Sequence, residues 1–358
     1  MNSRDRVNAA FARRPHDRVP RHETFWDDTI RRWEREGLKG GRGEALRELG
    51  SDFAYVPGFS WPSPFPGREE TVREDDNTRT FRDEWGATLR LFKDHQTTPE
   101  HLGWECDSPE AWHGRFRETI LAAESPLDLD LFKQRFAAAR REEKWTFFNT
   151  VEPFESLRKL IGDEETMISI KEEPEWIVDM AEVTTTRSLR TLEHIHDAGI
   201  HADGLWIYGD MAFNHATFCS PADYRELIWP QHKRLCDWAK ERGMKTIYHT
   251  DGNINGVIDH YIEAGIDVLQ PLEGKAGMDL RDLVPRYGDR LGFFGNIDVM
   301  VLIRGDLEEI EEEIRRKFAA GMANNGYLYH SDHSIPPQVS WETYQAILRM
   351  VRRYGNYE

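Results

Sequence analysis

The stretch of this sequence with the clearest chemical potential is residues 245–253, where a short apolar run ends in a polar turn that contains glycine. His249 and Asp251 stand at positions i and i+2, so on an extended backbone both side chains point to the same side. Together they offer an imidazole and a carboxylate to a metal ion. Without a metal, His249 paired with Asp251 or Glu273 is a general base with its orienting carboxylate. The turn therefore predicts one wall of an active site.

Five predicted strands in the second half of the chain, including the one just described, end in groups of this kind. In chain order these are Asp210, His249, Asp251, Glu273, Asn296, Asp298, His330, Asp332 and His333. Imidazoles and carboxylates delivered from separate strands to one edge are the ligands that zinc, iron and manganese use in proteins. A bound metal would act as a Lewis acid or lower the pKa of a bound water or thiol.

Each of these residues also has a structural interpretation. A histidine at a strand end, such as His249, is often only a hydrogen-bonded residue. Asp210 and Asp332 are typical of residues that cap the following turn. We expect His330 to face the helices rather than the site.

The segments that must hold these groups alternate between strand and helix from residue 145 onward. Six short apolar or β-branched runs are predicted strands: 146–151, 204–208, 246–248, 268–272, 291–294 and 326–329. Helical segments lie between them: 175–198, 221–242, 254–264, 280–287 and 307–324. This alternation predicts parallel β/α units. With two more candidate strands, at 21–26 and 52–56, the total is about eight, which predicts a (β/α)8 TIM-type barrel with its site at the carboxyl ends of the strands.

Residues 1–144 contain the first strands and an excursion that we expect to cap the barrel. The β-prone runs 78–81 and 88–92 predict a hairpin, and the charged residues 98–142 predict helices. No predicted strand is followed by the Gly-x-Gly-x-x-Gly turn of a dinucleotide-binding sheet. We therefore expect a single barrel domain over residues 1–358, with residues 145–358 forming its regular β/α units.

The composition narrows the class of protein. The chain has 64 acidic and 47 basic residues, and its net charge of -17 argues against nucleic-acid binding and against anionic membrane surfaces. No apolar run approaches the roughly 20 residues of a membrane helix, and the charged amino terminus does not resemble a secretion signal, so we expect a cytoplasmic protein. The three cysteines, Cys106, Cys219 and Cys236, are far apart, which predicts buried thiols rather than disulfides.

Aromatic residues gather in one proline-rich loop near the end of the second candidate strand. Phe59, Trp61 and Phe65 lie within residues 57–67. Packing of a long loop is the favoured interpretation, and lining of a substrate mouth is the alternative.

Several short motifs, in a consistent order, resemble a known family. They are Asp17-Arg18-Val19-Pro20, Tyr208-Gly209-Asp210, Ser220-Pro221, His249-Thr250-Asp251-Gly252-Asn253, Gly265-Ile266-Asp267, Gly295-Asn296-Ile297-Asp298 and Ile335-Pro336-Pro337. The chain resembles the uroporphyrinogen decarboxylase superfamily, which also contains cobalamin-dependent methyltransferases that move a methyl group from a corrinoid to a thiol. The resemblance implies a (β/α)8 barrel with its site at the carboxyl rim.

Two comparisons place the chain nearer the methyltransferase branch than the decarboxylases. The decarboxylases hold their substrate's carboxylates with an Arg-Gln-Ala-Gly-Arg run after the first strand, whereas residues 21–26 here read Arg-His-Glu-Thr-Phe-Trp. The methyltransferases bind zinc through His-x-Cys and a later Cys, and the matching positions here are His249, Asp251 and His333. The resemblance therefore implies a divalent metal, zinc, held by these three residues.

Our leading hypothesis is a metal-dependent methyltransferase that moves a methyl group between a small methylated substrate, or a corrinoid, and an acceptor. Asp210, Glu273 and Asp332 are then catalytic or substrate-orienting groups. The candidate partners are a protein that carries cobalamin and a second copy of the chain in a homodimer. Two rivals are a decarboxylase-like lyase that uses Asp210 with the His249 and Asp251 pair without a metal, and a corrinoid or tetrapyrrole binding protein without turnover.

Overall fold

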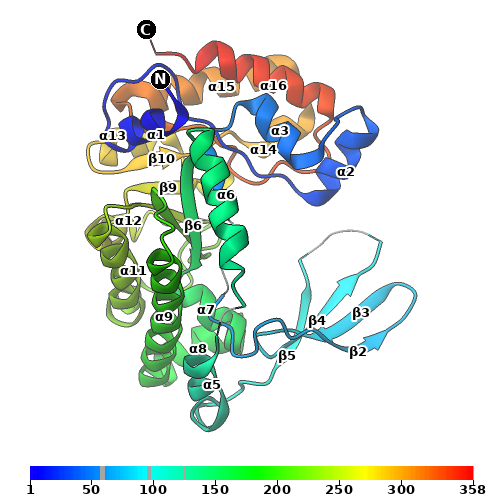
Figure 1. The fold of residues 1–358 in the computed structure, drawn as a ribbon, viewed down its shortest axis with the longest axis vertical. Coiled ribbons are helices and arrows are strands. Elements are labelled where there is room, and N and C mark those ends of the chain that lie inside the picture. The colour runs from blue at the N-terminus through cyan, green and yellow to red at the C-terminus, as the bar shows by residue number, and fades with distance from the viewer. Residues whose placement is uncertain (57–60, 95–97, 125, 358) are drawn as a thin grey trace.

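The centre of the protein is a seven-stranded parallel sheet, seen in a computed structural model that describes residues 1–56, 61–94, 98–124 and 126–357. The strand order is β1-β6-β7-β8-β9-β10-β11 (Figure 1). The strands are β1 (Phe53–Tyr55), β6 (Trp145–Val151), β7 (Gly204–Tyr208), β8 (Lys245–Thr250), β9 (Val268–Pro271), β10 (Gly292–Phe294) and β11 (Tyr327–Leu328). The predicted α/β fold with a parallel sheet is confirmed.

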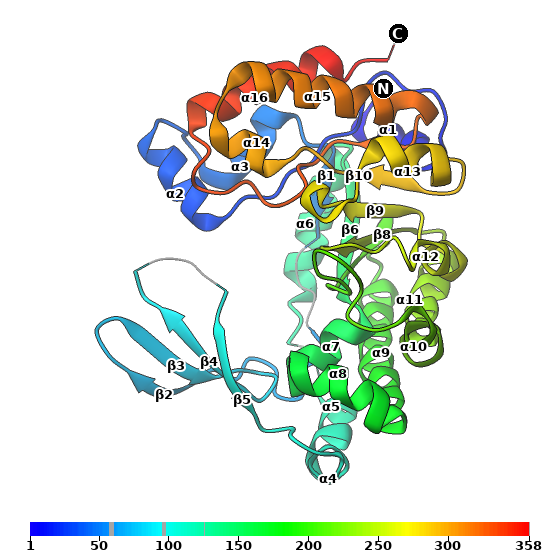
Figure 2. The ribbon, with the colours of Figure 1, turned by 180° about the vertical axis from the view of Figure 1, so that it is seen from behind.

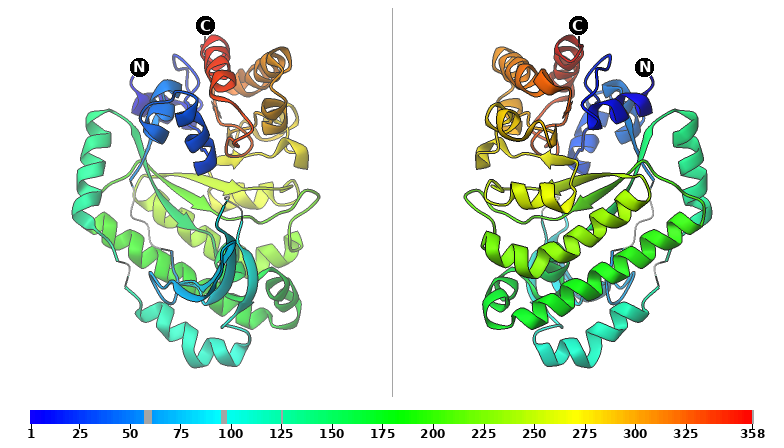
Figure 3. Two further views of the ribbon diagram at one scale, coloured as in Figure 1. Left: turned by 90° about the vertical axis from the view of Figure 1, so that its right-hand side faces the viewer. Right: turned by 90° about the vertical axis from the view of Figure 1, so that its left-hand side faces the viewer.

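Helices join consecutive strands and lie outside the sheet (Figure 3). They are α6 (Leu129–Arg141), α7 (Pro153–Ile161), α8 (Asp163–Glu172), α9 (Pro174–Asp197), α10 (Pro221–Asp223), α11 (Trp229–Glu241), α12 (Ile258–Ala264), α13 (Leu280–Tyr287), α14 (Val299–Arg304), α15 (Leu307–Gly321) and α16 (Trp341–Tyr354). Before the sheet come α1 (Ser3–Phe11), α2 (Asp27–Arg35) and α3 (Gly41–Leu49), and before α6 come α4 (Pro109–Ala111) and α5 (Arg117–Ala122). Across the described residues, no helix combines the length and apolar character that a membrane crossing requires.

Both faces of the sheet are buried. Successive side chains of each strand point to opposite sides, so each strand contributes residues to both faces. The inner face carries an aromatic and aliphatic cluster closed from below by α1: Val7, Ala10, Phe11, Phe53, Trp145, Phe147, Trp206, Ile247, Val268, Phe294 and Leu328. The alternate residues, such as Phe148, Leu205 and Leu269, pack in the larger core that includes the helices. The inner cluster gives the carboxyl ends of the strands a rigid floor.

The segment 21–26, which the sequence predicts as a strand, forms only single parallel bridges. Arg21 is bridged to Tyr329, and Phe25 to Ile335. The Tyr329 N–H donates to the Pro20 carbonyl at 2.8 Å and the Asp52 N–H donates to the Arg21 carbonyl at 2.8 Å, so the segment lies between β11 and β1. Pro20 has no N–H to extend a ladder, which shortens the pairing. The structure therefore shows seven strands of the expected eight.

A second, antiparallel sheet stands apart from the first one (Figures 1 and 2). It contains β2 (Glu70–Glu74), β3 (Thr78–Arg82), β4 (Ala87–Phe92) and β5 (Glu100–Trp104), in that order. The predicted hairpin is its central pair, β3 and β4. The prediction of helix from residue 98 onward was wrong for β5, because β4 offers its free edge to residues 100–104 and cross-strand pairing outweighs their charged composition.

A buried carboxylate ties the start of the chain to β1. Asp52 is fully buried and accepts hydrogen bonds from the Arg6 and Arg18 guanidinium groups, each at 2.7 Å. Its Oδ2 also accepts the Arg21 N–H at 2.8 Å. The group therefore fixes α1 and the entry segment against the edge of the sheet.

We expect Asp52→Asn to lower the free energy of unfolding by about 3–5 kcal/mol, because it leaves two guanidinium charges facing a neutral group. Urea denaturation followed by circular dichroism measures the change. The matched control is Glu312→Gln, which breaks exposed ion pairs with Arg315 and Arg316 and is expected to change the stability little, because solvent screens these charges. Equal small losses in both variants would contradict this role of Asp52.

Candidate functional site

The structure brings Asp210, His249 and Asp251 together at the carboxyl ends of β7 and β8. One ligand atom from each lies within 4.8 Å of the others. The His249 Nε2 is 3.8 Å from the Asp210 Oδ1, and the same oxygen accepts the Asp251 N–H at 3.0 Å. An imidazole and two carboxylates thus face one small volume.

His333, from the loop after β11, adds a second imidazole to this group. Its Nε2 lies 3.8 Å from the Asp251 Oδ2, and its ring is stacked on Trp26 with the centroids 6.2 Å apart. Of the three predicted metal ligands, His249 and Asp251 thus lie together with Asp210, and His333 lies beside Asp251 but outside the group of mutually close ligand atoms.

One oxygen of Asp251 has no partner. Its Oδ1 is buried and forms no hydrogen bond within the described ranges. Burial raises the pKa of Asp251 to about 6; His249 opposes this rise and Asp210 adds to it. A buried orphan oxygen beside imidazoles and a second carboxylate is a donor set that fits a divalent cation.

Glu273 fixes the turn that follows β8. Its Oε2 accepts the Gly252 N–H at 2.8 Å, and its Oε1 pairs with the Lys275 ammonium at 2.9 Å. Gly252 has a φ of 84°, and a Cβ there would lie 2.5 Å from the Ala212 backbone, so only glycine fits. Glu273 and Gly252 therefore set the position of Asp251.

Asp332 braces two neighbouring loops. Its Oδ2 accepts the Gly274 N–H at 3.1 Å, and its Oδ1 accepts the Val299 N–H at 2.9 Å. Burial raises the pKa of Asp332 to about 6. Both oxygens point to backbone donors, and the structure places Asp332 behind the loops of Glu273 and Asp298.

Gln270 was not among the predicted site residues. The His249 Nδ1 lies against the Gln270 Oε1, which only accepts hydrogen bonds, so Nδ1 is the donor of this contact and Nε2 is the ring nitrogen that faces Asp210. Gln270 stands two residues after Val268 of the inner cluster, so strand parity places both side chains on the inner face. That parity is the signal that could have found Gln270.

A cavity of about 490 Å³ opens beside His249. It is lined by His22, Thr24, Tyr55, Trp61, Phe147, Asn149, Thr150, Trp206, Tyr208, His249, Gln270 and Ser334. Trp61 thus lines a cavity, as the alternative prediction of a substrate mouth requires. Phe65 instead packs edge-on against Phe116, with the ring centroids 5.6 Å apart. Phe59 lies outside the described residues.

Below the cavity, Glu23 and His330 form a buried pair, so the expectation that His330 faces the helices was wrong. The His330 ring contacts His22 and Phe294 on the inner face, because it shares the parity of Leu328. The His330 Nδ1 donates to the Ser331 carbonyl at 2.6 Å, and its Nε2 faces the Glu23 Oε1 at 3.3 Å. Burial raises the pKa of Glu23 to about 8 and lowers the pKa of His330 to about 3, so a protonated Glu23 faces a neutral imidazole.

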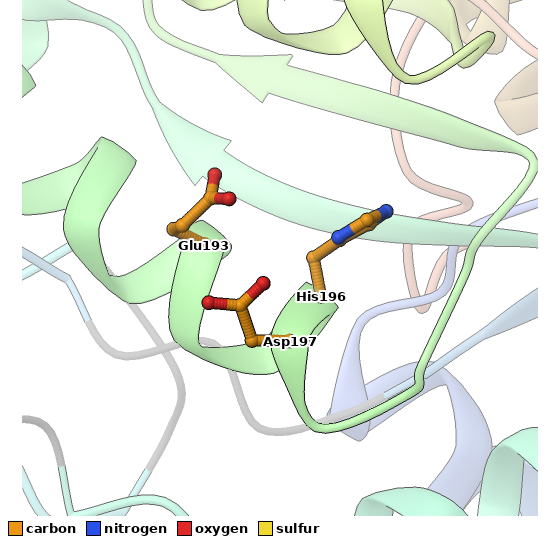
Figure 4. Close-up of side chains that lie close together, drawn as sticks. All are labelled: Glu193, His196 and Asp197. Atoms are coloured by element: carbon orange, nitrogen blue, oxygen red, sulfur yellow. The ribbon is translucent and has the colours of Figure 1, made fainter.

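A second cluster of ligand-type side chains comes from the last turns of α9. Glu193, His196 and Asp197 leave the same helix (Figure 4). Glu193 already accepts the Trp238 indole N–H at 2.6 Å and pairs with the Arg242 guanidinium, and the His196 Nε2 faces His201 at 3.0 Å. Because a guanidinium already compensates Glu193, this cluster is the weaker cation site.

Comparison with known proteins places the chain in a family. The family model for uroporphyrinogen decarboxylase (URO-D) matches residues 149–354, which is more than half of the chain. The chain belongs to the uroporphyrinogen decarboxylase family. The matched residues run from β6 to α16 and include the polar residues at the strand ends, from Asp210 to His333, but not Trp26 or the cavity residues that precede residue 149.

Curated URO-D relatives match over shorter lengths. Uroporphyrinogen decarboxylase from Thermus thermophilus is 27% identical over 136 residues, 37% of this chain and 37% of its own. The enzyme from Saccharopolyspora erythraea is 31% identical over 32% of this chain and 33% of its own, and that from Nocardia farcinica is 26% identical over 52% and 51%. The chain therefore spans only about a third to a half of the length of these relatives.

A methyltransferase from Methanosarcina mazei has the same fold along the whole URO-D-like chain. Its TM-score is 0.67 at 15% identity, over 99% of this chain and 99% of its own. At this level of identity the likeness shows a shared fold.

We expect the stability of Glu23→Gln relative to the wild type to rise with pH. Between pH 4.5 and about 8 the folded wild type keeps a proton on Glu23 that the unfolded chain has released, so the wild type loses stability over this window. Glutamine does not titrate, and the difference in unfolding free energy should shift in its favour by about 2–4 kcal/mol between pH 5 and pH 8. Urea denaturation of both proteins at each pH measures this, and a difference independent of pH would mean that Glu23 is ionised in the fold.

Proposed function

We propose that this URO-D family member is a metal-dependent methyltransferase that moves a methyl group between a small methylated substrate, or a corrinoid, and an acceptor. The observation that carries the proposal is the convergence of Asp210, His249 and Asp251 within 4.8 Å, with a buried orphan oxygen on Asp251. His333 completes the donor set from the opposite loop. Nitrogen and carboxylate donors of this kind suit zinc.

A bound zinc ion would supply Lewis acidity and favour the anionic form of an acceptor or leaving group. The chain's own residues prepare the site for it. Gln270 takes the Nδ1 proton of His249 in a hydrogen bond and leaves Nε2 available as a ligand. Glu273 holds the turn that carries Asp251, and the Trp26 ring keeps His333 in place by stacking.

We place the corrinoid on a partner protein. The cavity beside His249 measures about 490 Å³, a volume that suits a drug-sized molecule rather than a macrocycle with its side chains. This protein would then bind the small substrate and present it to the partner at the open rim.

A decarboxylase-like lyase without a metal is the second candidate, because the curated relatives are uroporphyrinogen decarboxylases. Within the described residues, no lysine or arginine side chain lines the cavity. Arg21, the one arginine of residues 21–26, is buried and directs its guanidinium to the Val351 carbonyl of α16. A substrate with several carboxylates lacks its cationic partners here, so methyl transfer is the better supported activity.

We further propose that the seven strands and residues 20–22 close into a (β/α)8 barrel within a single domain. The bridge between Arg21 and Tyr329 and the hydrogen bond from Asp52 N–H to the Arg21 carbonyl support closure between β11 and β1.

The first test is metal content. We expect the purified wild type, after exposure to zinc and removal of the excess, to retain about one zinc ion per chain in elemental analysis. His249→Ala and Asp251→Ala should lose it, because each removes a ligand from a set of only a few. His113→Ala, which removes an exposed histidine from the 112–116 turn, is the matched control. A wild type that transfers methyl groups after complete removal of metal would exclude this mechanism.

The second test concerns the orientation of His249. We expect Gln270→Leu to weaken zinc binding by about 10- to 100-fold, because the imidazole loses the partner that fixes its Nδ1 proton. Competition with a zinc-binding dye measures the affinity. Gln134→Leu, at an exposed position of α6, should leave it unchanged. Unchanged affinity in Gln270→Leu would show that the hydrogen bond does not prepare His249 for a metal.

A further inference from the structure

We propose that the cavity beside His249 binds an uncharged aromatic substrate that donates a hydrogen bond to Asn149. This inference rests on the proposed function in one respect: that the substrate carries a methyl group, which faces the metal-binding set. His249 connects the two, because it lies both at the cavity and in that set. The class of molecule follows from the cavity wall itself.

The wall is mainly aromatic and preorganised. Phe147 and Trp206 are buried on the inner face with centroids 5.0 Å apart. Tyr55 lies 5.6 Å from Phe147, and Trp61 meets Tyr208 edge-on at 5.8 Å. Rings held in place by neighbouring rings present flat apolar surfaces without further ordering, and such surfaces favour another planar ring.

The charges around the cavity disfavour an anion. Its polar lining groups are hydroxyls, amides and imidazoles, and in the described part of the chain it has no ammonium or guanidinium lining. Burial lowers the pKa of His22 to about 4, so this imidazole is neutral near pH 7. Asp210 and Asp251 stand at the rim beside His249, where they would offset the charge of a bound divalent metal, so the rim offers a carboxylate no net positive charge.

A cation is disfavoured as well. The Lys159 ammonium lies 5.0 Å from the centre of the Trp61 ring, so this ring already interacts with a positive charge. No carboxylate is among the described lining residues, and the proposed metal already takes Asp210 and Asp251 at the rim, so a cation in the cavity would lack a direct counter-charge. The wall therefore selects a neutral molecule.

Asn149 supplies the polar point of recognition. Its Oδ1 is buried without a hydrogen-bond partner in the described chain, although it stands in the middle of β6 with Phe147 on the same face. A buried acceptor of this kind gains most from a ligand that brings a donor, such as a phenolic hydroxyl. The volume of about 490 Å³ leaves room for a substituted ring, since a cavity of about 150 Å³ already holds benzene.

The experiment compares four probes on the full-length, zinc-treated protein by isothermal titration calorimetry: 2-methoxyphenol, methoxybenzene, 2-methoxybenzoate and tetramethylammonium. We expect 2-methoxyphenol to bind most tightly, methoxybenzene about 3- to 10-fold more weakly because it has no donor, and the two ions weakest. Tighter binding of either ion than of 2-methoxyphenol would overturn the proposal.

Variants separate this inference from a general loss of structure. Asn149→Leu should remove the preference for 2-methoxyphenol over methoxybenzene while methoxybenzene still binds, which shows that the cavity is intact. Asn77→Leu, in the exposed turn between β2 and β3, should keep the preference. An unchanged preference in Asn149→Leu would refute the role of Asn149.

The same titrations on His249→Ala distinguish this inference from the proposed function. If metal binding fails in every protein but the order of the probes holds, the methyltransferase proposal falls and the substrate class stands. If zinc binds at His249 but the ions bind more tightly than 2-methoxyphenol, the methyltransferase proposal stands and the substrate class falls.

Discussion

Four carboxylates converge at the strand ends, and their mutual repulsion is the constraint on which the rim depends. Asp210 accepts the Asp251 N–H, Glu273 accepts the Gly252 N–H, and Asp332 accepts the N–H groups of Gly274 and Val299. Every donor lies in the segment that follows a strand, either in a turn or at the start of a helix, so compensating the charges also orders these segments. Of these four carboxylates, only Asp251 keeps a buried oxygen that has no hydrogen-bond partner among the residues that the structure describes. The uncompensated charge of the rim is therefore concentrated on the residue that faces both histidines.

Beneath the rim, the aromatic floor sharpens this electrostatic contrast. Phe147, Trp206 and Phe294 offer no charged or strongly polar group, so an ionised group beside them is costly, as the raised pKa of Glu23 and the lowered pKa of His330 indicate. The inner face is consequently neutral and the rim is charged. The His249 ring lies at this boundary, with Gln270 on its inner side and Asp210 on its outer side.

Much of this arrangement follows from the period of two along a strand. That period predicts His249 and Asp251 on one face, and it also predicts Gln270 through its parity with Val268. His330 was misassigned although it stands two residues before Asp332 and shares the parity of Leu328. Gln270 and Asn149 carry no ionisable group, so a search for chemistry passes over them. The strand β5 and the Glu23–His330 pair depend on partners distant in sequence, which local pattern does not reveal.

The charge of the rim links metal binding to the choice of substrate. The carboxylates of Asp210 and Asp251 that would hold a divalent cation lie beside the cavity that a substrate must enter. An anionic tetrapyrrole would pass these groups without meeting a lysine or arginine among the described lining residues, so the features that favour a cation disfavour the substrate of the curated relatives. Relative to the His-x-Cys and Cys pattern that the chain resembles, Asp251 would exchange one thiolate for a carboxylate and His333 the other for an imidazole, which makes the proposed metal site harder. An uncharged molecule in the cavity would instead meet the aromatic wall and the Asn149 Oδ1, which has no hydrogen-bond partner in the described part of the chain.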